Sequence, residues 1–560
     1  MNNSTTTVIN RISARWFFLV FWLLTFVIYI ATARAGWVID GVGFLYNMKH
    51  QGFWDFINRT YSQDQSFYQV LTLHYYIFYK IWGLNPWMWG LLYVTLHALN
   101  VYLLFLISKN ILSDSGVGNS RVIALAGSLL FIVAPHISEI LVCRAYYHYL
   151  QCFFFILLIL YWAQKYQHNP RPGYIVGSLA LFALSVFTLE VFYIIPILVV
   201  AIALYYHFVL GIEKKIFRKT ILYFVIGQVL LLIVYFLALF ARFRHLTPHK
   251  IEINQGPLDY LTKLPKYFFH IVLLGRYFSA EVKDKVYAMC GSGSVIIIFY
   301  GLIVYYFVYF ISRFNTITNY GKAIFLFFIL ALINVSFLTP LPFPDSSLEV
   351  FYDRYTYFTD AFVYILLAMI VVKYVKNKYI IIGLFCVYVD FNLYFTIQVN
   401  TYWIQSDAIN NRLLRNFPDC GNKTVLLLNN PENMNGAPMI GAQPEGIFKG
   451  MLEIYTGRTV PNTIYDVASY NMNADYNGAH VTVINDTTLM VVLNHGGTWW
   501  WYEGHGAVNY ETPDYKTDFK TVGMRYDITL KRPAGNYLIL YSVGDKWKTV
   551  DMSLKNKQQD

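Results

Sequence analysis

Apolar stretches close to the length of a membrane-spanning helix recur along the first 400 of the 560 residues. A bilayer is crossed by about 20 consecutive apolar residues in a helix. The chain is 57% hydrophobic and 13% charged, whereas a soluble domain has about 25% charged residues. These features predict a polytopic α-helical membrane protein with about eleven transmembrane helices. The predicted spans are 16–33, 86–108, 121–135, 149–164, 174–189, 191–210, 220–241, 294–312, 323–339, 360–375 and 379–397.

The positive charges predict the orientation of these spans. With a cytoplasmic N-terminus, every inner link carries at least two Lys or Arg residues, as cytoplasmic loops do. An odd number of spans then places the C-terminus outside. The net charge of +11 does not indicate a nucleic-acid partner, because the basic residues are dispersed over short links. These residues are Arg11, Arg15, Lys109, Arg121, Lys165, Arg171, Lys214, Lys215, Arg218, Lys219, Arg313, Lys322, Lys373, Lys376 and Lys378.

The composition changes after about residue 400, where Asn, Asp, Gly and Thr become frequent. Alternating runs such as "KTVLLLNN", "HVTVIND", "LMVVLNH" and "NYLILYSVG" are typical of strands, and helices are expected near 403–416 and 444–457. We therefore predict two domains: a transmembrane module, 1–400, and a mixed α/β domain on the outer face, 401–560. About 160 residues can bury a core of their own.

Four groups of ionisable residues lie on the predicted outer face. A charge in or beside a membrane span is costly and indicates function by default. The first group follows the first span, the second lies in "APHISEILVCRAYYHY", the third follows the seventh span, and the fourth precedes the tenth. Their members are Asp40, Asp55 and Asp64; His136, Glu139, Arg144 and His148; Arg242, Arg244, His245, His249, Lys250, Lys263, Lys266 and Arg276; and Asp353 and Arg354.

A carboxylate beside several arginines on one face suits displacement at a sugar carbon with a phosphate leaving group. Arginine offers a planar, permanently charged fork to phosphate oxygens, and a carboxylate can deprotonate an attacking hydroxyl. Any single interfacial Arg or Asp is more often an anchor or a helix cap. Spacing alone leaves a membrane enzyme and a transporter as alternatives. The five cysteines show no CxxC spacing, so no cysteine metal site is expected.

Three stretches resemble one enzyme family. "LNPWMWGLLYVTLHALNVYLLFLISKNIL" (84–112), "AGSLLFIVAPHISEILVCR" (126–144) and "DRYTYFTDAFVYILLAM" (353–369) are similar to motifs of GT-C-type glycosyltransferases that use polyprenyl-phosphate sugars. The closest resemblance is to bacterial relatives of the transmembrane O-mannosyltransferases with tetratricopeptide repeats. The resemblance covers about residues 15–395. It implies a GT-C fold, an N-in bundle of about eleven helices whose first outer loop carries the catalytic acid. We therefore expect a bacterial inner-membrane enzyme that transfers a monosaccharide to a cell-envelope glycan, lipid or protein, and single displacement would give inversion. The odd number of spans places the C-terminal domain in the periplasm.

The resemblance also implies roles for individual residues. Asp40 matches the catalytic acid of the first outer loop and would be the general base. Arg354 matches a phosphate-facing arginine, with Arg144 or Arg276 as a second phosphate ligand. The supporting residues are His136, Glu139, Asp64, Asp353 and Tyr355.

The chain departs from the family pattern at several positions. Gly41 replaces the second acid of the family's first-loop motif, so the pattern associated with metal binding is incomplete. No metal ligands are therefore assigned, although a divalent ion such as Mg or Mn is kept as an alternative. Two rival functions remain: a transporter or flippase of lipid-linked sugars, and a glycan ligase or polymerase with a lipid-pyrophosphate donor. The transporter is disfavoured, because charges crowd one face rather than the membrane midplane.

Overall fold

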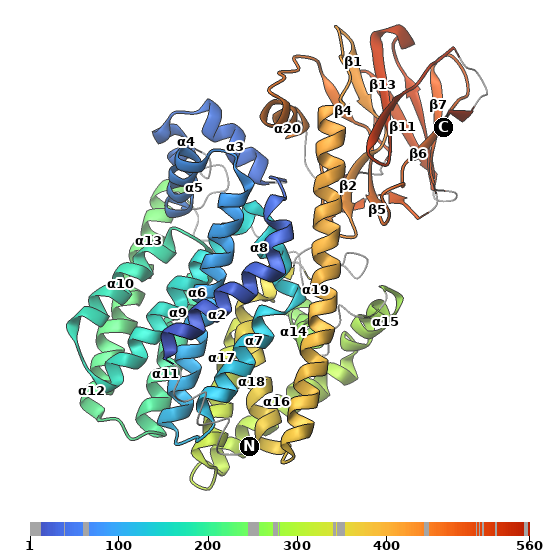
Figure 1. Ribbon diagram of the computed structural model, residues 1–560. Coiled ribbons are helices and arrows are strands. Elements are labelled where there is room, and N and C mark those ends of the chain that lie inside the picture. The colour runs from blue at the N-terminus through green and yellow to red at the C-terminus, as the bar shows by residue number, and fades with distance from the viewer. Residues whose placement is uncertain are drawn as a thin grey trace.

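We describe the chain from a computed structural model (Figure 1). The described residues are 13–38, 40–59, 67–244, 257–272, 278, 280–339, 343, 353–441, 447–494, 496–499, 501–502, 505–506, 509–520, 524–553 and 558–559. They form a bundle of helices, from which one long helix leads to a domain rich in strands (Figure 1).

The bundle consists of helices along most of the chain before residue 378. They are α2 (Ala14–Tyr29) continued by η1 (Ile30–Arg34), α3 (Asp40–His50), α4 (Phe53–Arg59), α5 (Gln69–Trp82), α6 (Pro86–Asp114), α7 (Ser120–Ile132), η2 (Pro135–Ile137), α8 (Ser138–Val142), η3 (Arg144–Tyr146), α9 (Tyr147–His168), α10 (Pro172–Val186), η4 (Glu190–Ile194), α11 (Ile195–Phe208), α12 (Lys214–Thr220), η5 (Ile221–Ile226), α13 (Gly227–Phe243), α14 (Pro257–Val272), α15 (Ala280–Cys290), α16 (Gly293–Ser312), α17 (Asn319–Ser336), η7 (Asp353–Thr356) and α18 (Tyr357–Tyr374).

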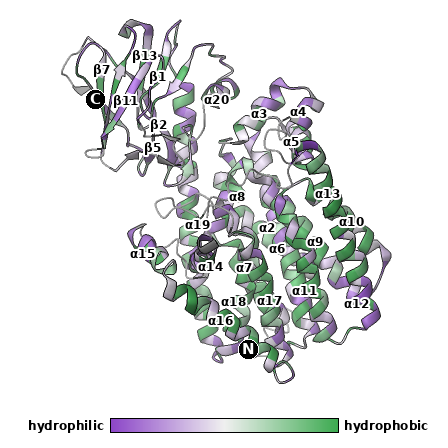
Figure 2. Cartoon of the chain, turned by 180° about the vertical axis from the view of Figure 1, so that it is seen from behind, coloured by the Kyte–Doolittle hydropathy of each residue, from purple (hydrophilic) through white to green (hydrophobic). Residues whose placement is uncertain are grey.

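The predicted spans coincide with these helices and with α19 (Lys378–Arg415). Within the described ranges, nine helices are long and apolar enough to cross a membrane, and α7 with η2–α8, bent by 54°, makes up to ten. The remaining predicted span corresponds to α10, which has 15 residues. Figure 2 shows α10, α13 and α16 largely hydrophobic, whereas α12 is hydrophilic and lies at the end of the bundle opposite the strand-rich domain.

Small residues let two bundle helices pack closely. A side chain at Gly127 of α7 would place its Cβ 2.8 Å from the Ile365 Cα of α18, so the two backbones nearly touch there. Such small-residue crossings are the usual way in which helices pack inside a membrane.

The start of helix α6 follows from its sequence. Asn85 caps the helix by accepting the Trp87 N–H at 3.1 Å, and Pro86 occupies its first turn.

Helix α19 links the two parts of the molecule. The sequence predicts a span at 379–397 and a separate helix at 403–416, but the structure shows one continuous helix of 38 residues. No Gly or Pro lies between the two predicted elements, so the change from apolar to polar residues does not interrupt the hydrogen bonding. The predicted domain boundary at residue 400 therefore falls inside α19, and the first strand begins at Thr424.

The strand-rich domain confirms the predicted α/β character of the C-terminal part. A mixed sheet has the order β14-β13-β1-β4, with β1 parallel to both β13 and β4. The other sheets are β11-β12-β7-β6-β15, β3-β2-β5-β8 and β10-β9. The elements are β1 (Thr424–Leu427), β2 (Asn430–Met434), β3 (Ala437–Pro438), α20 (Ile447–Thr456), β4 (Ile464–Asp466), β5 (Ser469–Met472), β6 (Ala479–Val483), β7 (Thr488–Leu493), β8 (Thr498–Trp499), β9 (Trp501–Tyr502), β10 (His505–Gly506), β11 (Tyr515–Lys520), β12 (Arg525–Leu530), η8 (Ala534–Asn536), β13 (Tyr537–Val543), β14 (Lys546–Thr549) and β15 (Gln558–Gln559).

Candidate functional site

Two of the sequence-predicted residues, Glu139 and Arg354, form a buried ion pair. Glu139 lies in the short helix α8 and Arg354 in the 3-10 turn η7 before α18. The Arg354 Nη1 donates to Glu139 Oε1 at 2.6 Å, and the Arg354 backbone N–H donates to Glu139 Oε2 at 2.8 Å. The Glu139 side chain is 1% exposed. A buried carboxylate is stable only when it is paired and hydrogen-bonded, and here both of its oxygens are bonded.

The Arg354 guanidinium also lies against two aromatic rings. Its central carbon is 4.4 Å from the ring centroid of Tyr146 and 4.7 Å from that of Tyr355, and its Nη2 donates to the Tyr355 hydroxyl at 3.3 Å. Cation–π contacts of this kind stabilise a guanidinium that is withdrawn from water. The predicted residues Arg354, Glu139 and Tyr355 therefore form one hydrogen-bonded group, in which the guanidinium charge is balanced by the Glu139 carboxylate.

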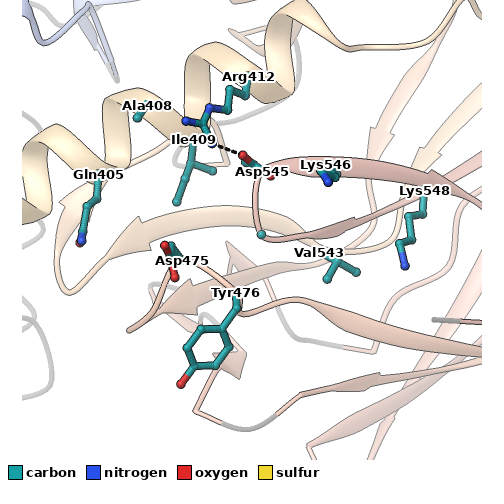
Figure 3. A pocket seen from close by; sticks show the side chains of 11 residues that line it. Gln405, Ala408, Ile409, Arg412, Asp475, Tyr476, Val543, Asp545, Lys546 and Lys548 are labelled. Carbon is teal, nitrogen blue, oxygen red and sulfur yellow. Dashed lines mark hydrogen bonds and ion pairs between the residues drawn. The ribbon is translucent and has the colours of Figure 1, made fainter.

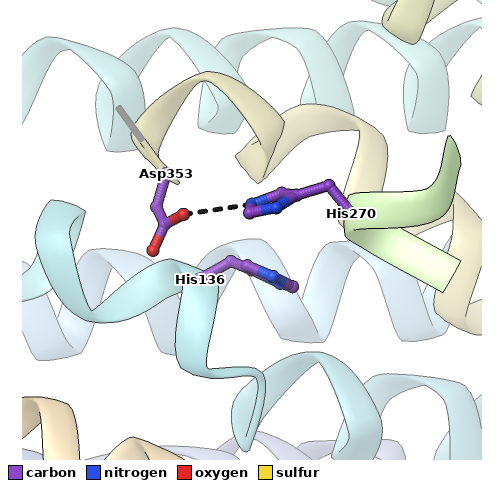
Figure 4. A group of neighbouring side chains, drawn as sticks. All are labelled: His136, His270 and Asp353. Atoms are coloured by element: carbon purple, nitrogen blue, oxygen red, sulfur yellow. Dashed lines mark hydrogen bonds and ion pairs between the residues drawn. The ribbon is translucent and has the colours of Figure 1, made fainter. Parts of the chain in front are cut away.

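Next to this pair, three further side chains converge from different elements (Figure 4). His270 of α14 lies 3.2 Å, Nε2 to Oδ1, from Asp353 of η7. The His136 ring of η2 lies 4.8 Å from the His270 ring, centroid to centroid. His136 and Asp353 are predicted site residues, and the structure brings them together through a histidine from a distant helix.

His136, His270 and Asp353 could together hold a metal ion. One ligand atom from each lies within 4.8 Å of the others, and all three residues are buried. Two imidazoles and one carboxylate suit ions such as Zn²⁺ or Mn²⁺ better than Mg²⁺, which prefers oxygen ligands. These three residues are therefore the candidate metal ligands in this structure. They do not include position 41, where the family motif has its second acid and this chain has glycine.

An apolar cavity of about 350 Å³ lies among the helices that carry these charged groups. Its lining comes from α14, α16, α17 and α18. Ile271, which is adjacent to His270, and Thr359, five residues after Arg354, both line it. The cavity is therefore lined by residues that are adjacent in sequence to the charged cluster, which consists of His136, Glu139, His270, Asp353, Arg354 and Asp360.

Arg144 occupies a different place from Arg354. Its Nη1 donates to the Leu141 carbonyl at 3.0 Å and its Nη2 to the Ala33 carbonyl at 3.2 Å. The side chain is fully buried, and Ala33 lies in η1, directly before the first outer loop. Arg144 thus ties α8 to the segment that precedes α3.

The first outer loop places Asp40 at the beginning of α3. The Asp40 side chain lies outside the described residues, as do Asp64 and Arg276. Steric crowding explains why the neighbouring position 41 is glycine, because a Cβ there would lie 2.8 Å from the Trp37 ring. Trp37 is 2% exposed and packs edge-on against Trp89, with ring centroids 4.8 Å apart. The indole therefore occupies the space that the family's second acid would need.

A separate polar cleft lies between the outer end of α19 and the strand-rich domain (Figure 3). It has a volume of about 510 Å³. Arg412 of α19 pairs with Asp545 across it, and Asp475, Tyr476 and Lys548 line its other walls. It contains none of the sequence-predicted site residues.

Sequence reasoning missed two buried members of the cluster, His270 and Asp360. The Asp360 Oδ2 lies 3.9 Å from His136 Nδ1 and accepts a hydrogen bond from the Thr356 hydroxyl at 2.9 Å. Asp360 is a lone charge at the start of an apolar span, which was a usable signal. His270 sits among aromatic residues in "PKYFFHIV", where no pattern separates it from a packing histidine.

Comparison with protein families finds no family that matches this sequence, and comparison with curated proteins finds no match either. Among solved structures, the crystal structure of ArnT from Cupriavidus metallidurans in the apo state is similar to this chain. The similarity covers 80% of this chain and 90% of that chain, with 11% sequence identity and a TM-score of 0.40.

Proposed function

We propose that this protein is a GT-C-type membrane glycosyltransferase. It transfers a monosaccharide from a polyprenyl-phosphate-linked donor to an acceptor on the outer face of the membrane, with inversion at the sugar carbon. In this proposal Asp40 is the general base, and Arg354 is the principal phosphate ligand. Arg144 and Arg276 remain as candidates for further phosphate contacts.

One observation carries the proposal: the apolar cavity of about 350 Å³ shares its helices α14 and α18 with the charged cluster. A lipid-linked sugar phosphate likewise combines an apolar part and a charged part, because its apolar chain is attached to an anionic head. The cavity would hold the first isoprene units between helices, and Arg354 would face the phosphate. An arginine held by Glu139 and two aromatic rings needs little reorganisation when charge develops on a leaving group.

The reaction is a single displacement. The acceptor hydroxyl oxygen attacks the anomeric carbon as the bond from that carbon to the phosphate oxygen breaks. The phosphate leaves with the bonding electron pair as polyprenyl phosphate, and the proton of the acceptor hydroxyl passes to the Asp40 carboxylate. General-base catalysis of this kind contributes about 10²–10⁴-fold in rate. His136, His270 and Asp353 would hold a divalent cation, which would supply further positive charge for the phosphate.

The experiment gives the full-length protein in detergent a panel of synthetic polyprenyl-phosphate monosaccharides together with a cell-envelope extract as the source of acceptor, and polyprenyl phosphate release is measured by mass spectrometry. We expect release with one sugar, and a fall of at least about 100-fold in Asp40→Asn. Asp486→Asn, an exposed residue of the strand-rich domain, is the matched control and should retain wild-type turnover.

Wild-type turnover in Asp40→Asn would remove Asp40 from the mechanism. Turnover only with a lipid-pyrophosphate oligosaccharide would replace the proposal by the glycan ligase or polymerase. Movement of the lipid-linked sugar across a vesicle membrane without release of polyprenyl phosphate would replace it by the flippase.

A further inference from the structure

In the short segment before Asp40, the backbones of Gly36 and Trp37 form hydrogen bonds to residues that follow them by about 400 positions. Residues 35–38 lie between η1 and α3. The Gly36 N–H donates to Asp407 Oδ1 of α19 at 2.7 Å. The Tyr455 hydroxyl of α20 accepts from the Trp37 N–H at 2.5 Å and donates to the Trp37 carbonyl at 2.8 Å. One phenol thus engages both backbone polar groups of Trp37, three residues before Asp40.

Gly36 shows how closely these parts approach. A Cβ at position 36 would overlap the Tyr455 hydroxyl and would lie 3.0 Å from Asp407 Oδ1. Any residue larger than glycine would therefore push the segment away from its two partners. The close contact of this segment with Tyr455 and Asp407 therefore requires glycine at position 36.

The far end of α3 is held by the same helix, α20. Glu453 accepts hydrogen bonds from Lys49 Nζ at 2.8 Å and pairs with His50 Nε2 at 2.7 Å. The hydrogen bond from Lys49, followed by that from His50, lowers the pKa of the Glu453 carboxyl. Between the two ends, α20 packs along α3: Gly450 faces Tyr46, and an added Cβ would be only 3.5 Å from its ring.

The described part of the bundle adds an electrostatic contact to this arrangement. Arg144, which donates to the Ala33 carbonyl, interacts electrostatically with Asp407 and Tyr455. Asp407 therefore accepts the Gly36 N–H and is also attracted by the Arg144 guanidinium. Burial raises the pKa of the Tyr455 phenol, so it stays protonated and can donate to the Trp37 carbonyl.

We propose that Asp407, Tyr455 and Glu453 are positioning residues that hold the first outer loop in its reactive geometry, and that the C-terminal part of the chain is required for catalysis through this contact. The inference rests on the proposed role of Asp40 as the base. We call the three residues and their partners Gly36, Trp37, Lys49 and His50 the loop clasp.

The physical reason is that backbone N–H and C=O groups withdrawn from water need partners, and Gly36 and Trp37 lie between helices, where no helix or strand ladder supplies them. The loop clasp provides those partners from outside. A displacement of about 1 Å at a reacting group costs up to about 100-fold in rate. The contribution of the loop clasp should therefore be found in kcat rather than in donor affinity.

The test is Tyr455→Phe in the full-length protein, which keeps the ring and removes both hydrogen bonds to Trp37. We expect kcat to fall about tenfold or more, with the donor KM changed less than about twofold. Hydrogen exchange, read by mass spectrometry on the peptide that contains Gly36 and Trp37, should become faster. Tyr476→Phe, at an exposed tyrosine of the polar cleft, is the matched control and should change neither quantity.

Asp407 offers a second variant pair. Asp407→Asn keeps a side-chain oxygen that accepts from Gly36 N–H, whereas Asp407→Leu does not. Asparagine should therefore retain more of the wild-type kcat than leucine.

The possible results distinguish a failure of the positioning role from a failure of the proposed function. Faster exchange in Tyr455→Phe with wild-type kcat would overturn the positioning role while the function stands. A lower kcat without faster exchange would overturn it as well, because the loop would not have been released. Wild-type turnover in Asp40→Asn would instead overturn the proposed function, whatever Tyr455→Phe does.

Discussion

The charged cluster and the first outer loop lie at the same end of the bundle, but they are held in opposite ways. In the cluster, Arg354 and Glu139 bond to each other inside the membrane module. In the loop, the backbone at Gly36 and Trp37 bonds to Asp407 and Tyr455, which come from α19 and α20. The Arg354–Glu139 pair joins two elements of the bundle, whereas the loop bonds to residues of α19 and α20.

This difference predicts two kinds of mutant. A change in the cluster leaves a buried charge without its partner, so it should lower stability together with activity. A change in the loop clasp breaks partly buried hydrogen bonds rather than a fully buried ion pair, so it should lower activity with a smaller loss of stability.

The largest effect is expected from breaking the buried pair. Arg354→Gln leaves the Glu139 carboxylate buried without its cation, which typically costs about 3–5 kcal/mol. We expect a clear fall in Tm in detergent and loss of sugar transfer. Arg144→Gln is the variant for comparison, because it also removes a buried arginine, but one that donates to two carbonyl groups.

Glu139→Gln combined with Arg354→Gln should recover much of the Tm but none of the activity, because the charge imbalance is removed while the phosphate ligand remains absent. If the double variant were no more stable than Arg354→Gln alone, the pair would not explain the stability of the cluster.

The second test concerns the proposed metal ligands of the cluster. His270→Gln removes one of three ligands, so metal affinity should fall by at least the factor of about 10–100 that is typical when a ligand loses its hydrogen-bonding partner. Metal content of the purified protein, measured by plasma mass spectrometry, should fall relative to wild type. Equal zinc and manganese content in wild type and His270→Gln would exclude this site as the place of a bound ion.

A smaller effect should come from the glycine of the loop clasp. Gly36→Ala forces its Cβ into the Tyr455 hydroxyl, so kcat should fall about tenfold with little change in Tm. The double variant with Tyr455→Phe removes the overlapping oxygen and should be less impaired than independent effects predict. Strictly multiplicative losses would show that the two residues do not meet.

The smallest effect on activity is expected from a buried acid of the strand-rich domain, Glu432 of β2. Burial, and then the nearby Asp466, raise the pKa of Glu432 to about 8, partly offset by a hydrogen bond from Ser469. Because the folded-state pKa exceeds the unfolded value near 4.5, folding binds a proton. Stability is therefore full below about pH 4.5 and is lost as the pH rises through about 8.

Glu432→Gln should remove this loss, so its Tm should exceed that of wild type at pH 8.5 while sugar transfer is unchanged at pH 7. Glu511→Gln is the matched control, because the hydrogen bond from Lys531 lowers the pKa of Glu511. Equal pH dependence of Tm in wild type and Glu432→Gln would contradict the raised pKa.

Much of the fold was readable from local sequence. Apolar length predicted the helices, since a bilayer demands about 20 apolar residues in a row, and the alternating runs predicted strands such as β7 and β13. The continuity of α19 was not readable, because its outer half is polar and looked like a separate helix. In the site, the pairing of Glu139 with Arg354 joins residues 215 positions apart, which no spacing rule connects.

By itself, the sequence determined that this chain is a helical membrane protein with a strand-rich C-terminal part, and that acids and arginines gather on one predicted face. Those properties follow from composition and short-range periodicity. Only the tertiary structure decided which of these groups meet: His270 with Asp353, Tyr455 with Trp37, and the Trp37 ring in the space beside Gly41. Such contacts depend on how distant segments pack, and packing is decided by the shape of the whole chain rather than by any stretch of it.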